Sequence, residues 1–395
     1  MKRVCVVTGS RAEYGLLKPV IDRIDKDIEL ELYLVVTGAH LTSDFGHTYE
    51  EIEKDGYVIK KKIEMLLSSD TPCGIAKSMG VEMIGFADVL ADNSPDMLVI
   101  LGDRYEMMVA AIAAMIYKIP IAHIHGGETT EGALDEAIRH SITKMSYLHF
   151  ASTETYRKRI IQLGEDPQRV FCVGALGIEN IEKLKLLDKK ELEDNIGFEF
   201  TQYTMMVTFH PVTLDMAGSI EQIKNLLEVL RRKKEFKIIF TRANADANGQ
   251  IINRIIDNFV EENVDRSIVY ASLGQVRYLS ALRYCCMVVG NSSSGIIEAP
   301  SFHIPTIDIG DRQKGRELAG SIIHCETDEK SIESAIDKAL NPEFKNSLKN
   351  MINPYAGENT SLRIVNIIKN FLGEKIDLKK KFYDLYVNIS QIPPL

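Results

Sequence analysis

The first half of the chain concentrates side chains that can accept or donate a proton. They are carboxylates and imidazoles with one guanidinium among them, at Asp103, His123, His125, Glu128, Asp135, Arg139 and His140. A reaction that moves protons at two separate points requires several such groups in one cleft. The sequence therefore predicts general acid–base chemistry in this region.

Each of these side chains also has a structural interpretation that the sequence leaves open. Asp103 could cap the helix that follows it, and Asp135 and Arg139, four residues apart, could pair on a helix surface. His123 and His125 would share one face of a regular strand, so one of them could be a core histidine. The run His-x-His-x-x-Glu could hold a metal ion, but it lacks further ligands at a suitable spacing, and we expect no metal.

A second kind of chemistry is indicated by Gly290-Asn-Ser-Ser-Ser-Gly295, a run of small residues between a predicted strand and a predicted helix. Backbone N–H groups and hydroxyls at such a helix start bind anions. Ser292, Ser293 and Ser294 are therefore candidates for phosphate binding, and Glu298, one turn later, for the hydroxyls of a ribose. A serine here could instead be a plain helix cap, and Glu298 could only complement the helix dipole.

Arginines at two other turns could neutralise a diphosphate. Arg11 stands at the start of a predicted helix, and Arg312 and Arg316 lie in a Gly-bounded turn of the second half, where Arg316 could equally be solvated. His210, at a strand end in the second half, is positioned to reach across to the same ligand. The spacing G-x-G-x-x-G is absent, so we expect no dinucleotide cofactor.

Short β-branched segments alternate with longer amphipathic ones, a pattern typical of parallel sheets built from strand–helix–strand units. Strands are predicted at Arg3–Thr8, Glu31–Val36, Met97–Leu101, Pro120–Ile124, Leu148–Ala151, Val170–Val173, Tyr203–Phe209, Phe236–Thr241, Ser267–Tyr270, Met287–Val289 and Pro305–Ile309. Helices are predicted between them, for example at Tyr14–Ile24, Tyr105–Ile116, Glu136–Met145 and Ser219–Arg232. The predicted fold class is α/β.

Most of the candidate residues directly follow a predicted strand, and open parallel sheets bind ligands at the carboxyl ends of their strands. A charged stretch without strand character, Lys183–Asn195, separates the two halves. We therefore predict two Rossmann-like domains that face each other across a cleft, the architecture called GT-B. The predicted units are a catalytic domain at 1–185, a nucleotide-binding domain at 186–365, and a helix with a loosely held tail at 366–395.

Composition narrows the class of ligand. The chain has 395 residues, with 47 Lys and Arg against 56 Asp and Glu, and a formal net charge of -9. This acidic balance disfavours nucleic acid and anionic membranes as partners. We find no apolar segment long enough for a membrane span or a signal peptide, and the six cysteines lack C-x-x-C spacing. We expect a cytoplasmic protein with a small anionic ligand.

The motifs form a joint pattern that is more specific than any one of them. It comprises Thr8-Gly-Ser-Arg-Ala-Glu-Tyr-Gly15, Leu101-Gly-Asp-Arg-Tyr-Glu106, His123-Ile-His-Gly-Gly-Glu128, Asp135-Glu-Ala-Ile-Arg-His140-Ser-Ile-Thr-Lys144, Phe209-His-Pro211, Gly290-Asn-Ser-Ser-Ser-Gly295 and Gly310-Asp-Arg-Gln-Lys-Gly-Arg316. Over nearly the whole chain this pattern resembles the hydrolysing UDP-N-acetylglucosamine 2-epimerases of sialic-acid and related nonulosonic-acid synthesis. That family has the GT-B architecture.

The resemblance implies a reaction without a cofactor. Members split UDP-N-acetylglucosamine, with inversion at C2, into N-acetylmannosamine and UDP, by elimination to 2-acetamidoglucal and rehydration. The catalytic residues expected here are Asp103, Glu128, Asp135, His125 and His210. The residues expected to bind the UDP-sugar are Arg11, His210, Ser292, Ser293, Ser294, Glu298 and Arg312.

Several alternatives stay open. Many relatives have Glu where this chain has His125, and Glu128 lies three residues further on, so either could take the role of that Glu. The sugar could be a UDP- or GDP-linked 2,4-diacetamido-6-deoxy analogue. A GT-B glycosyltransferase would share the donor site, although it would not need the acid–base cluster, and a nucleotide-sugar sensor would share it without turnover. We expect a homodimer or homotetramer, with the amphipathic stretch Ile75–Val89 as a possible contact face.

Overall fold

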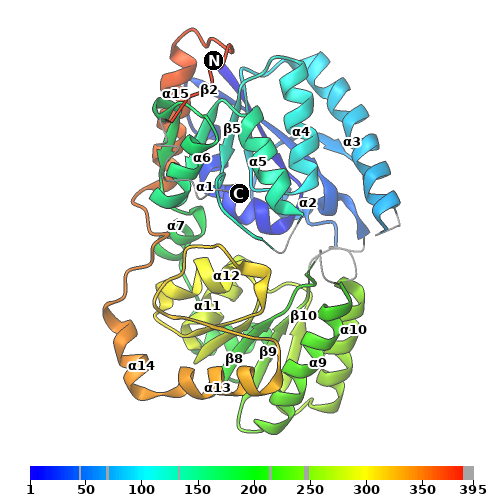
Figure 1. Cartoon of the computed structure of the whole chain (residues 1–395). Coiled ribbons are helices and arrows are strands. Elements are labelled where there is room, and N and C mark those ends of the chain that lie inside the picture. The colour runs from blue at the N-terminus through cyan, green and yellow to red at the C-terminus, as the bar shows by residue number, and fades with distance from the viewer. Residues whose placement is uncertain (44–45, 68–70, 132–133, 213–215, 244–248, 386–395) are drawn as a thin grey trace.

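Each half of the chain folds around its own parallel sheet (Figure 1). The structure, a computed structural model, describes residues 1–43, 46–67, 71–131, 134–212, 216–243 and 249–385. The strands of the first sheet are β1 (Lys2–Thr8), β2 (Leu30–Thr37), β3 (Ile59–Ile63), β4 (Met97–Leu101), β5 (Ile121–Ile124), β6 (Leu148–Ala151) and β7 (Val170–Cys172). The helices of this half are α1 (Arg11–Asp25), α2 (Tyr49–Lys54), α3 (Pro72–Asn93), α4 (Tyr105–Ile116), α5 (Asp135–Met145), α6 (Glu154–Gln162) and α7 (Leu176–Lys183).

The second half repeats the pattern. Its strands are β8 (Thr204–Thr208), β9 (Lys237–Thr241), β10 (Ser267–Tyr270), β11 (Met287–Gly290), β12 (Thr306–Ile309) and β13 (Ile322–Cys325). Its helices, and the last helix of the chain, are α8 (Lys189–Ile196), α9 (Met216–Arg232), α10 (Gly249–Glu262), α11 (Gln275–Tyr284), α12 (Ser293–Ile297), α13 (Glu329–Leu340), α14 (Pro342–Ser347) and α15 (Thr360–Gly373). Among the helices that the structure describes, none has the length and apolarity that a bilayer crossing needs.

Both sheets reverse their strand order beside their first strand. The order is β3-β2-β1-β4-β5-β6-β7 in one sheet and β10-β9-β8-β11-β12-β13 in the other. The connections that leave β1 and β4 diverge, as do those that leave β8 and β11, and such divergence opens a binding crevice at the strand ends. The predicted pair of Rossmann-like domains across a cleft is confirmed.

Helices cover both faces of the first sheet, which is why its strands are apolar at successive positions and not only at alternate ones. Val4 and Val6 of β1 share a core with α1 and α15 on one face. Cys5 and Val7, which point the other way, share a second core with α3 and α4. The strands are thereby fixed on both sides, and the positions of the loops at their ends are fixed with them.

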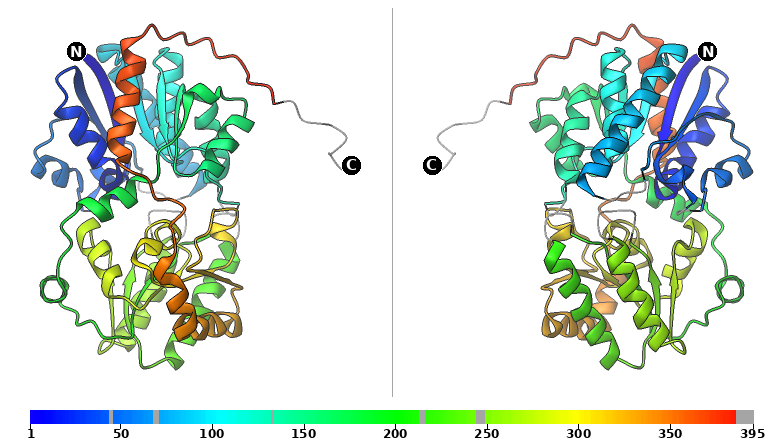
Figure 2. Two further views of the ribbon diagram at one scale, coloured as in Figure 1. Left: turned by 90° about the vertical axis from the view of Figure 1, so that its left-hand side faces the viewer. Right: turned by 90° about the vertical axis from the view of Figure 1, so that its right-hand side faces the viewer.

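The last helix returns to the first domain, as the two side views make clear (Figure 2). Four of its side chains join the core of the first sheet: Ile364, Val365, Ile368 and Leu372. The predicted boundary after residue 365 therefore falls inside α15. The chain crosses between the domains twice, before α8 and again before α15.

The prediction of a loosely held tail is wrong for the segment 374–383. Lys380 Nζ donates to the carbonyl oxygens of Lys144 (2.9 Å) and Ser146 (2.6 Å), and the Tyr383 N–H donates to the Gly164 carbonyl oxygen (2.9 Å). These bonds fasten the segment to the first domain because its lysine finds acceptors that the sequence pattern does not reveal. Residues 386–395 of the predicted tail lie outside the described residues.

Two strands were not predicted, β3 and β13, and both are edge strands. β3 reads Ile-Lys-Lys-Lys-Ile, with its three lysines exposed. Edge strands commonly carry lysines because charge discourages pairing with another chain. An edge strand of this kind lacks the apolar signal on which strand prediction depends.

Candidate active site

A cavity of about 400 Å³ lies between the domains, at the carboxyl ends of both sheets. The predicted site residues that line it are Arg11, Asp103, His125, Glu128, His210, Ser292, Ser293, Ser294, Glu298 and Arg312. Asp135 is half-buried at the first residue of α5 and is not part of this lining. The two domains thus contribute the predicted proton-transfer and anion-binding residues to one space.

Backbone geometry separates the two histidines that the sequence could not distinguish. His123 in β5 is fully buried, with Nε2 2.7 Å from the Gly102 carbonyl oxygen and Nδ1 3.3 Å from Thr143 Oγ1. Burial lowers the pKa of His123 to about 3, so its ring is neutral. His125 has a φ of +65°, which takes it out of the strand geometry, and it lines the cavity. One residue is a core histidine and the other is a site residue.

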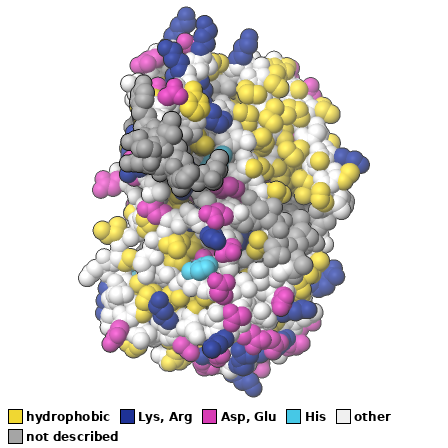
Figure 3. Space-filling view, viewed as in Figure 1, with side chains coloured by type: hydrophobic (Ala, Val, Ile, Leu, Met, Phe, Trp, Pro, Cys, Tyr) yellow, Lys and Arg dark blue, Asp and Glu magenta, His cyan; other side chains and the backbone are white. Residues whose placement is uncertain are grey.

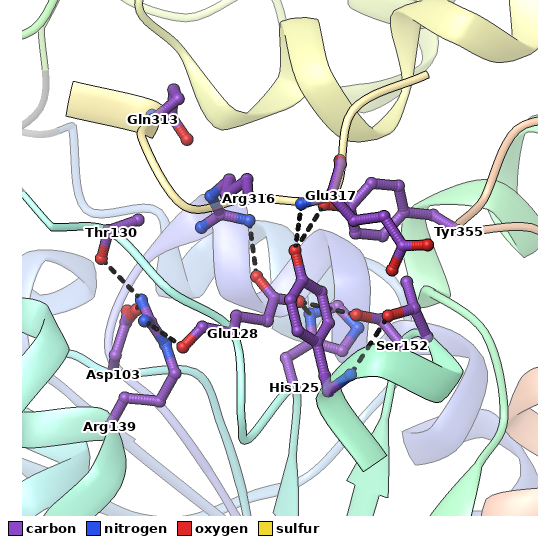
Figure 4. A network of polar contacts seen from close by, with 12 residues as sticks. Asp103, His125, Glu128, Thr130, Arg139, Ser152, Gln313, Arg316, Glu317 and Tyr355 are labelled. Atoms are coloured by element: carbon purple, nitrogen blue, oxygen red, sulfur yellow. Dashed lines mark hydrogen bonds and ion pairs between the residues drawn. The ribbon is translucent and has the colours of Figure 1, made fainter. Parts of the chain in front are cut away.

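The carboxylate of Glu128 is buried where β5 ends (Figure 4). Oε2 lies 2.5 Å from Arg316 Nη1, while Oε1 accepts a hydrogen bond from Ser152 Oγ (2.8 Å) and lies 3.9 Å from His125 Nδ1. Burial opposes ionisation, but the charge of Arg316, together with the smaller effects of His125, Arg139 and the Ser152 hydrogen bond, outweighs it and lowers the pKa of Glu128. Glu128 is therefore ionised at neutral pH and can accept a proton.

Asp103 forms an ion pair with Arg139, which reaches it from α5. The Arg139 side chain is 1% exposed, donates to the Glu128 carbonyl oxygen (2.9 Å) and lies 3.1 Å from Glu136 Oε2. Burial would raise the pKa of Asp103, yet the charge and hydrogen bond of Arg139, with a smaller effect of Arg316, together lower it below the ordinary value. Arg104 and not Asp103 occupies the N-cap position of α4, so the helix-cap interpretation does not apply.

The Ser-rich loop, residues 290–295, lies on the wall of the cavity that the second domain forms. Gly290 has a φ of +134°, and a Cβ there would lie 1.9 Å from the Thr208 carbonyl oxygen, so the loop can leave β11 only through glycine. Ser292 occupies the N-cap of α12 without a side-chain capping bond. Ser292 and Ser293 both line the cavity. Ser294 instead donates to Glu298 Oε2 and lies 2.7 Å from the Tyr278 hydroxyl.

Two residues of this wall were missed by sequence reasoning. Tyr278 lies on a helix of ordinary composition and offers no sequence signal. Asn291 is part of the Gly-Asn-Ser run, but its role depends on a distant partner: its side chain accepts from the His210 N–H (2.7 Å) and donates to the His210 carbonyl oxygen (2.8 Å). Asn291 therefore joins the ends of β8 and β11. Burial raises the pKa of Glu298, which lies on the same wall.

Two arginines face the cavity from different domains. Arg11 Nε lies 2.9 Å from Glu51 Oε2, and a Cβ on Gly274 of the second domain would come within 2.6 Å of Arg11 Nη2. Arg312 Nη1 donates to the Asn291 carbonyl oxygen (3.0 Å). Each guanidinium is oriented by a protein acceptor and still borders the cavity. Within the described ranges, no three His, Cys, Asp or Glu side chains are grouped to hold a metal ion.

Comparison with known proteins identifies the family. The family model described as UDP-N-acetylglucosamine 2-epimerase matches residues 22–369. The chain belongs to this family. The match covers both sheets except β1, and it covers the cavity lining except Arg11, Ala12, Gly15 and Leu16.

Several relatives of the epimerase family are similar along most of their length. The chain is 43% identical to a hydrolysing GDP/UDP-N,N'-diacetylbacillosamine 2-epimerase of Campylobacter jejuni, over 87% of this chain and 89% of that one. It is 41% identical to a polysialic acid biosynthesis protein of Escherichia coli, over 98% of both. The fold matches that of the UDP-GlcNAc 2-epimerase of Methanocaldococcus jannaschii in complex with UDP-GlcNAc and UDP, with a TM-score of 0.76, 19% identity and coverage of 94% and 100%. The relatives thus include 2-epimerases that act on UDP- or GDP-linked sugars.

Proposed function

We propose that this chain is a hydrolysing 2-epimerase that converts UDP-N-acetylglucosamine and water into N-acetylmannosamine and UDP. A base removes the C2 proton while the C1–O bond to UDP breaks, which leaves 2-acetamidoglucal. Water then adds at C1, and a proton returns to C2 from the opposite face. The observation that carries the proposal is one cavity lined by both ionised carboxylates and an anion-binding loop.

The proton-transfer roles go to groups whose protonation states suit them. Asp103 and Glu128 have lowered pKa values, so each can act as a base at neutral pH. His125 is neutral because burial lowers its pKa, and its Nε2 has no hydrogen-bond partner among the described residues. We assign C2 proton transfer to Glu128 in preference to His125. Asp135 and His210 keep their predicted catalytic roles as part of the proposal.

The departure of UDP requires stabilisation of a diphosphate. Arg11 and Arg312 bring positive charge from opposite domains, and Ser292 and Ser293 border the same space. Each preorganised donor of this kind typically increases kcat by a factor of about 10²–10³. Glu298 is the proposed acceptor for the ribose hydroxyls.

The substrate has a second candidate. The identity of 43% to an epimerase acting on diacetylbacillosamine favours a UDP- or GDP-linked 2,4-diacetamido-6-deoxy sugar. The identity of 41% to a polysialic acid biosynthesis protein favours UDP-N-acetylglucosamine and the sialic-acid pathway. The test compares kcat/KM for UDP-N-acetylglucosamine, for the UDP-linked 2,4-diacetamido-6-deoxy sugar and for its GDP-linked form. The better substrate has the larger value.

The reaction type is tested by proton NMR of the product formed in D₂O. We expect N-acetylmannosamine with deuterium at C2, because the returning proton comes from a group that exchanges with water. A product without deuterium at C2 rules out the elimination route. Transfer of the sugar to an added acceptor, with no free N-acetylmannosamine, would identify a glycosyltransferase instead.

We also propose that the enzyme is a cytoplasmic homodimer. The α3/α4 face, defined by Val81, Ile84, Met115, Ile116 and Tyr117, exposes these side chains by 38–68%. In Figure 3 hydrophobic side chains gather over α3 and α4 without interspersed charge. An apolar, Met- and Tyr-bearing patch with few charges is typical of an interface core, and a second copy can bury it by two-fold symmetry.

The cytoplasmic location rests on the free thiols, which persist in a reducing compartment.

A further inference from the structure

One loop of the second domain makes polar contacts with the first domain. This cross-cleft loop, residues 310–319, leaves β12 and reaches the turn that follows β5. The Glu131 N–H donates to the Lys314 carbonyl oxygen (3.3 Å), and the Glu317 N–H donates to the Tyr156 hydroxyl (2.8 Å). Between these two bonds, Arg316 pairs with Glu128 (Figure 4).

The other end of the cross-cleft loop is fixed to the Ser-rich loop. Arg312 Nη1 and Gln313 Nε2 both donate to the Asn291 carbonyl oxygen, at 3.0 and 2.8 Å. A few residues of chain therefore connect the anion-binding wall of the cavity to the carboxylate on the opposite wall. A movement of one domain relative to the other must displace Arg316 with respect to Glu128.

The close approach of the cross-cleft loop depends on one glycine. Gly315 has a φ of +85°, and a Cβ there would lie 2.5 Å from Thr129 Cγ2, next to Glu128 in the chain. A side chain at this position would both strain the backbone and hold the two domains apart.

The surroundings of Glu128 come from several elements, but the arginine beside its carboxylate comes from the other domain. Within the first domain, His125 and Arg139 carry or can carry charge, Ser152 donates a hydrogen bond, and Tyr156 lies nearby. From beyond the cleft come Arg316 and, from the segment before α15, Tyr355. The side chains of Arg316 and Glu128 are 7% and 5% exposed, so solvent barely screens their attraction.

We propose that Arg316 is a positioning residue that makes Glu128 a competent base only while the two domains are closed on each other. In the closed state the guanidinium holds the carboxylate ionised and fixes its orientation. When the domains separate, Arg316 leaves with the cross-cleft loop, and Glu128 keeps its place in the first domain, where burial favours the protonated form. Proton abstraction at C2 is thereby confined to the closed state. This inference rests on the proposed role of Glu128 in the epimerase reaction.

The test compares Arg316→Gln and Arg316→Lys with the wild type. Loss of the charge lets burial raise the pKa of Glu128. In a plot of kcat/KM against pH, the acidic limb, where activity falls as the pH decreases, should therefore move to higher pH by about one unit or more. We expect kcat to fall by about 10²–10³ in Arg316→Gln. Arg316→Lys keeps the charge, so its acidic limb should lie close to the wild-type position.

Two further variants isolate the mechanism. Arg312→Gln removes the other arginine of the loop, which contacts Asn291 and not Glu128, so it should weaken UDP binding and leave the acidic limb in place. Gly315→Val keeps Arg316 but opposes the close approach, and it should shift the limb as Arg316→Gln does. An unmoved limb in Arg316→Gln, or equal shifts in Arg312→Gln and Arg316→Gln, overturns the inference.

A second readout separates this inference from the proposed function. In protein labelled with ¹³C at glutamate side-chain carboxyls, the Glu128 resonance, assigned by its loss in Glu128→Gln, gives the pKa directly and without any substrate. If the wild type does not epimerise UDP-N-acetylglucosamine but Arg316→Gln raises this pKa, the function is wrong and the pairing stands. An unchanged pKa refutes the role of Arg316 whatever the substrate is.

Discussion

Individual side chains in the cavity owe their protonation states to partners far away in sequence. Asp103 is ionised because Arg139 pairs with it, and Glu128 because Arg316 reaches it from the other domain. The sequence predicted both carboxylates from their position after strands. It could not predict their partners, since these depend on how α5 and the cross-cleft loop pack.

A matched pair of variants separates proton transfer from structural pairing. Asp103 and Glu136 both contact Arg139, but only Asp103 belongs to the described cavity lining. Asp103→Asn should lower kcat by several powers of ten while UDP still binds, the signature of an interaction made in the transition state. Glu136→Gln should cost about 1–3 kcal/mol of stability and change kcat by less than about tenfold. Steady-state kinetics, calorimetry with UDP and thermal unfolding supply the three readouts. Equal losses of kcat in both variants would mean that Asp103 only supports Arg139.

The choice between Glu128 and His125 is settled by a second comparison. Glu128→Gln should lose about 10²–10⁴ in kcat, whereas His125→Ala should retain more activity. Because the pKa of Glu128 is lowered, the wild type should keep its activity down to pH values below about 4.3, the ordinary glutamate value, and lose it as Glu128 becomes protonated. Rate measurements between pH 3 and 8 check this. A dead His125→Ala beside an active Glu128→Gln would reverse the assignment.

At the scale of elements, the central strands were predictable, whereas two of the four edge strands were not. Met97–Leu101 and Leu148–Ala151 agree with the predicted strands to the residue, because central strands are buried and apolar. β3 and β13 lie at sheet edges, and the three exposed lysines of β3 remove that signal there. The site was found because its residues follow central strands. The return of α15 was missed because an amphipathic helix does not reveal which sheet it covers.

The contact between α7 and α12 gives a prediction at this scale. A Cβ on Gly177 would lie 2.8 Å from Glu298 Oε1, so Gly177→Ala should displace that carboxylate from its place on the cavity wall. We expect UDP affinity to fall several-fold with little change in melting temperature, measured by calorimetry and thermal unfolding. Gly373→Ala, with open space around its Cβ, is the control and should bind UDP like the wild type. Unchanged UDP binding in Gly177→Ala would remove Glu298 from the nucleotide site.

At the scale of the whole molecule, the α3/α4 face is an apolar surface that the described part of the chain leaves uncovered. Ile84 and Ile116 are 68% and 64% exposed there. The double variant Ile84→Glu/Ile116→Glu should convert a dimer into a monomer, because facing charges would be buried without partners. Sedimentation velocity at micromolar concentration measures the change. Ile28→Glu, at an isoleucine that is 89% exposed elsewhere, should stay dimeric. A monomeric wild type, or a dimer unaffected by the double variant, contradicts the assignment of this face.

The position of α15 in the first domain has a consequence for how the protein is made. Its four core side chains contribute about 6–12 kcal/mol of burial, which is comparable to the whole stability of a domain. Translation of the seven strands of the first sheet is therefore not enough to complete the core of the first domain. That core must wait for nearly all of the second half, roughly 10–40 s at ordinary elongation rates. During that interval the second sheet can form first, while the core of the first domain stays incomplete. Nascent chains arrested at residue 359 should accordingly remain sensitive to protease in the first domain, and chains arrested beyond the point where residue 373 leaves the ribosome should not.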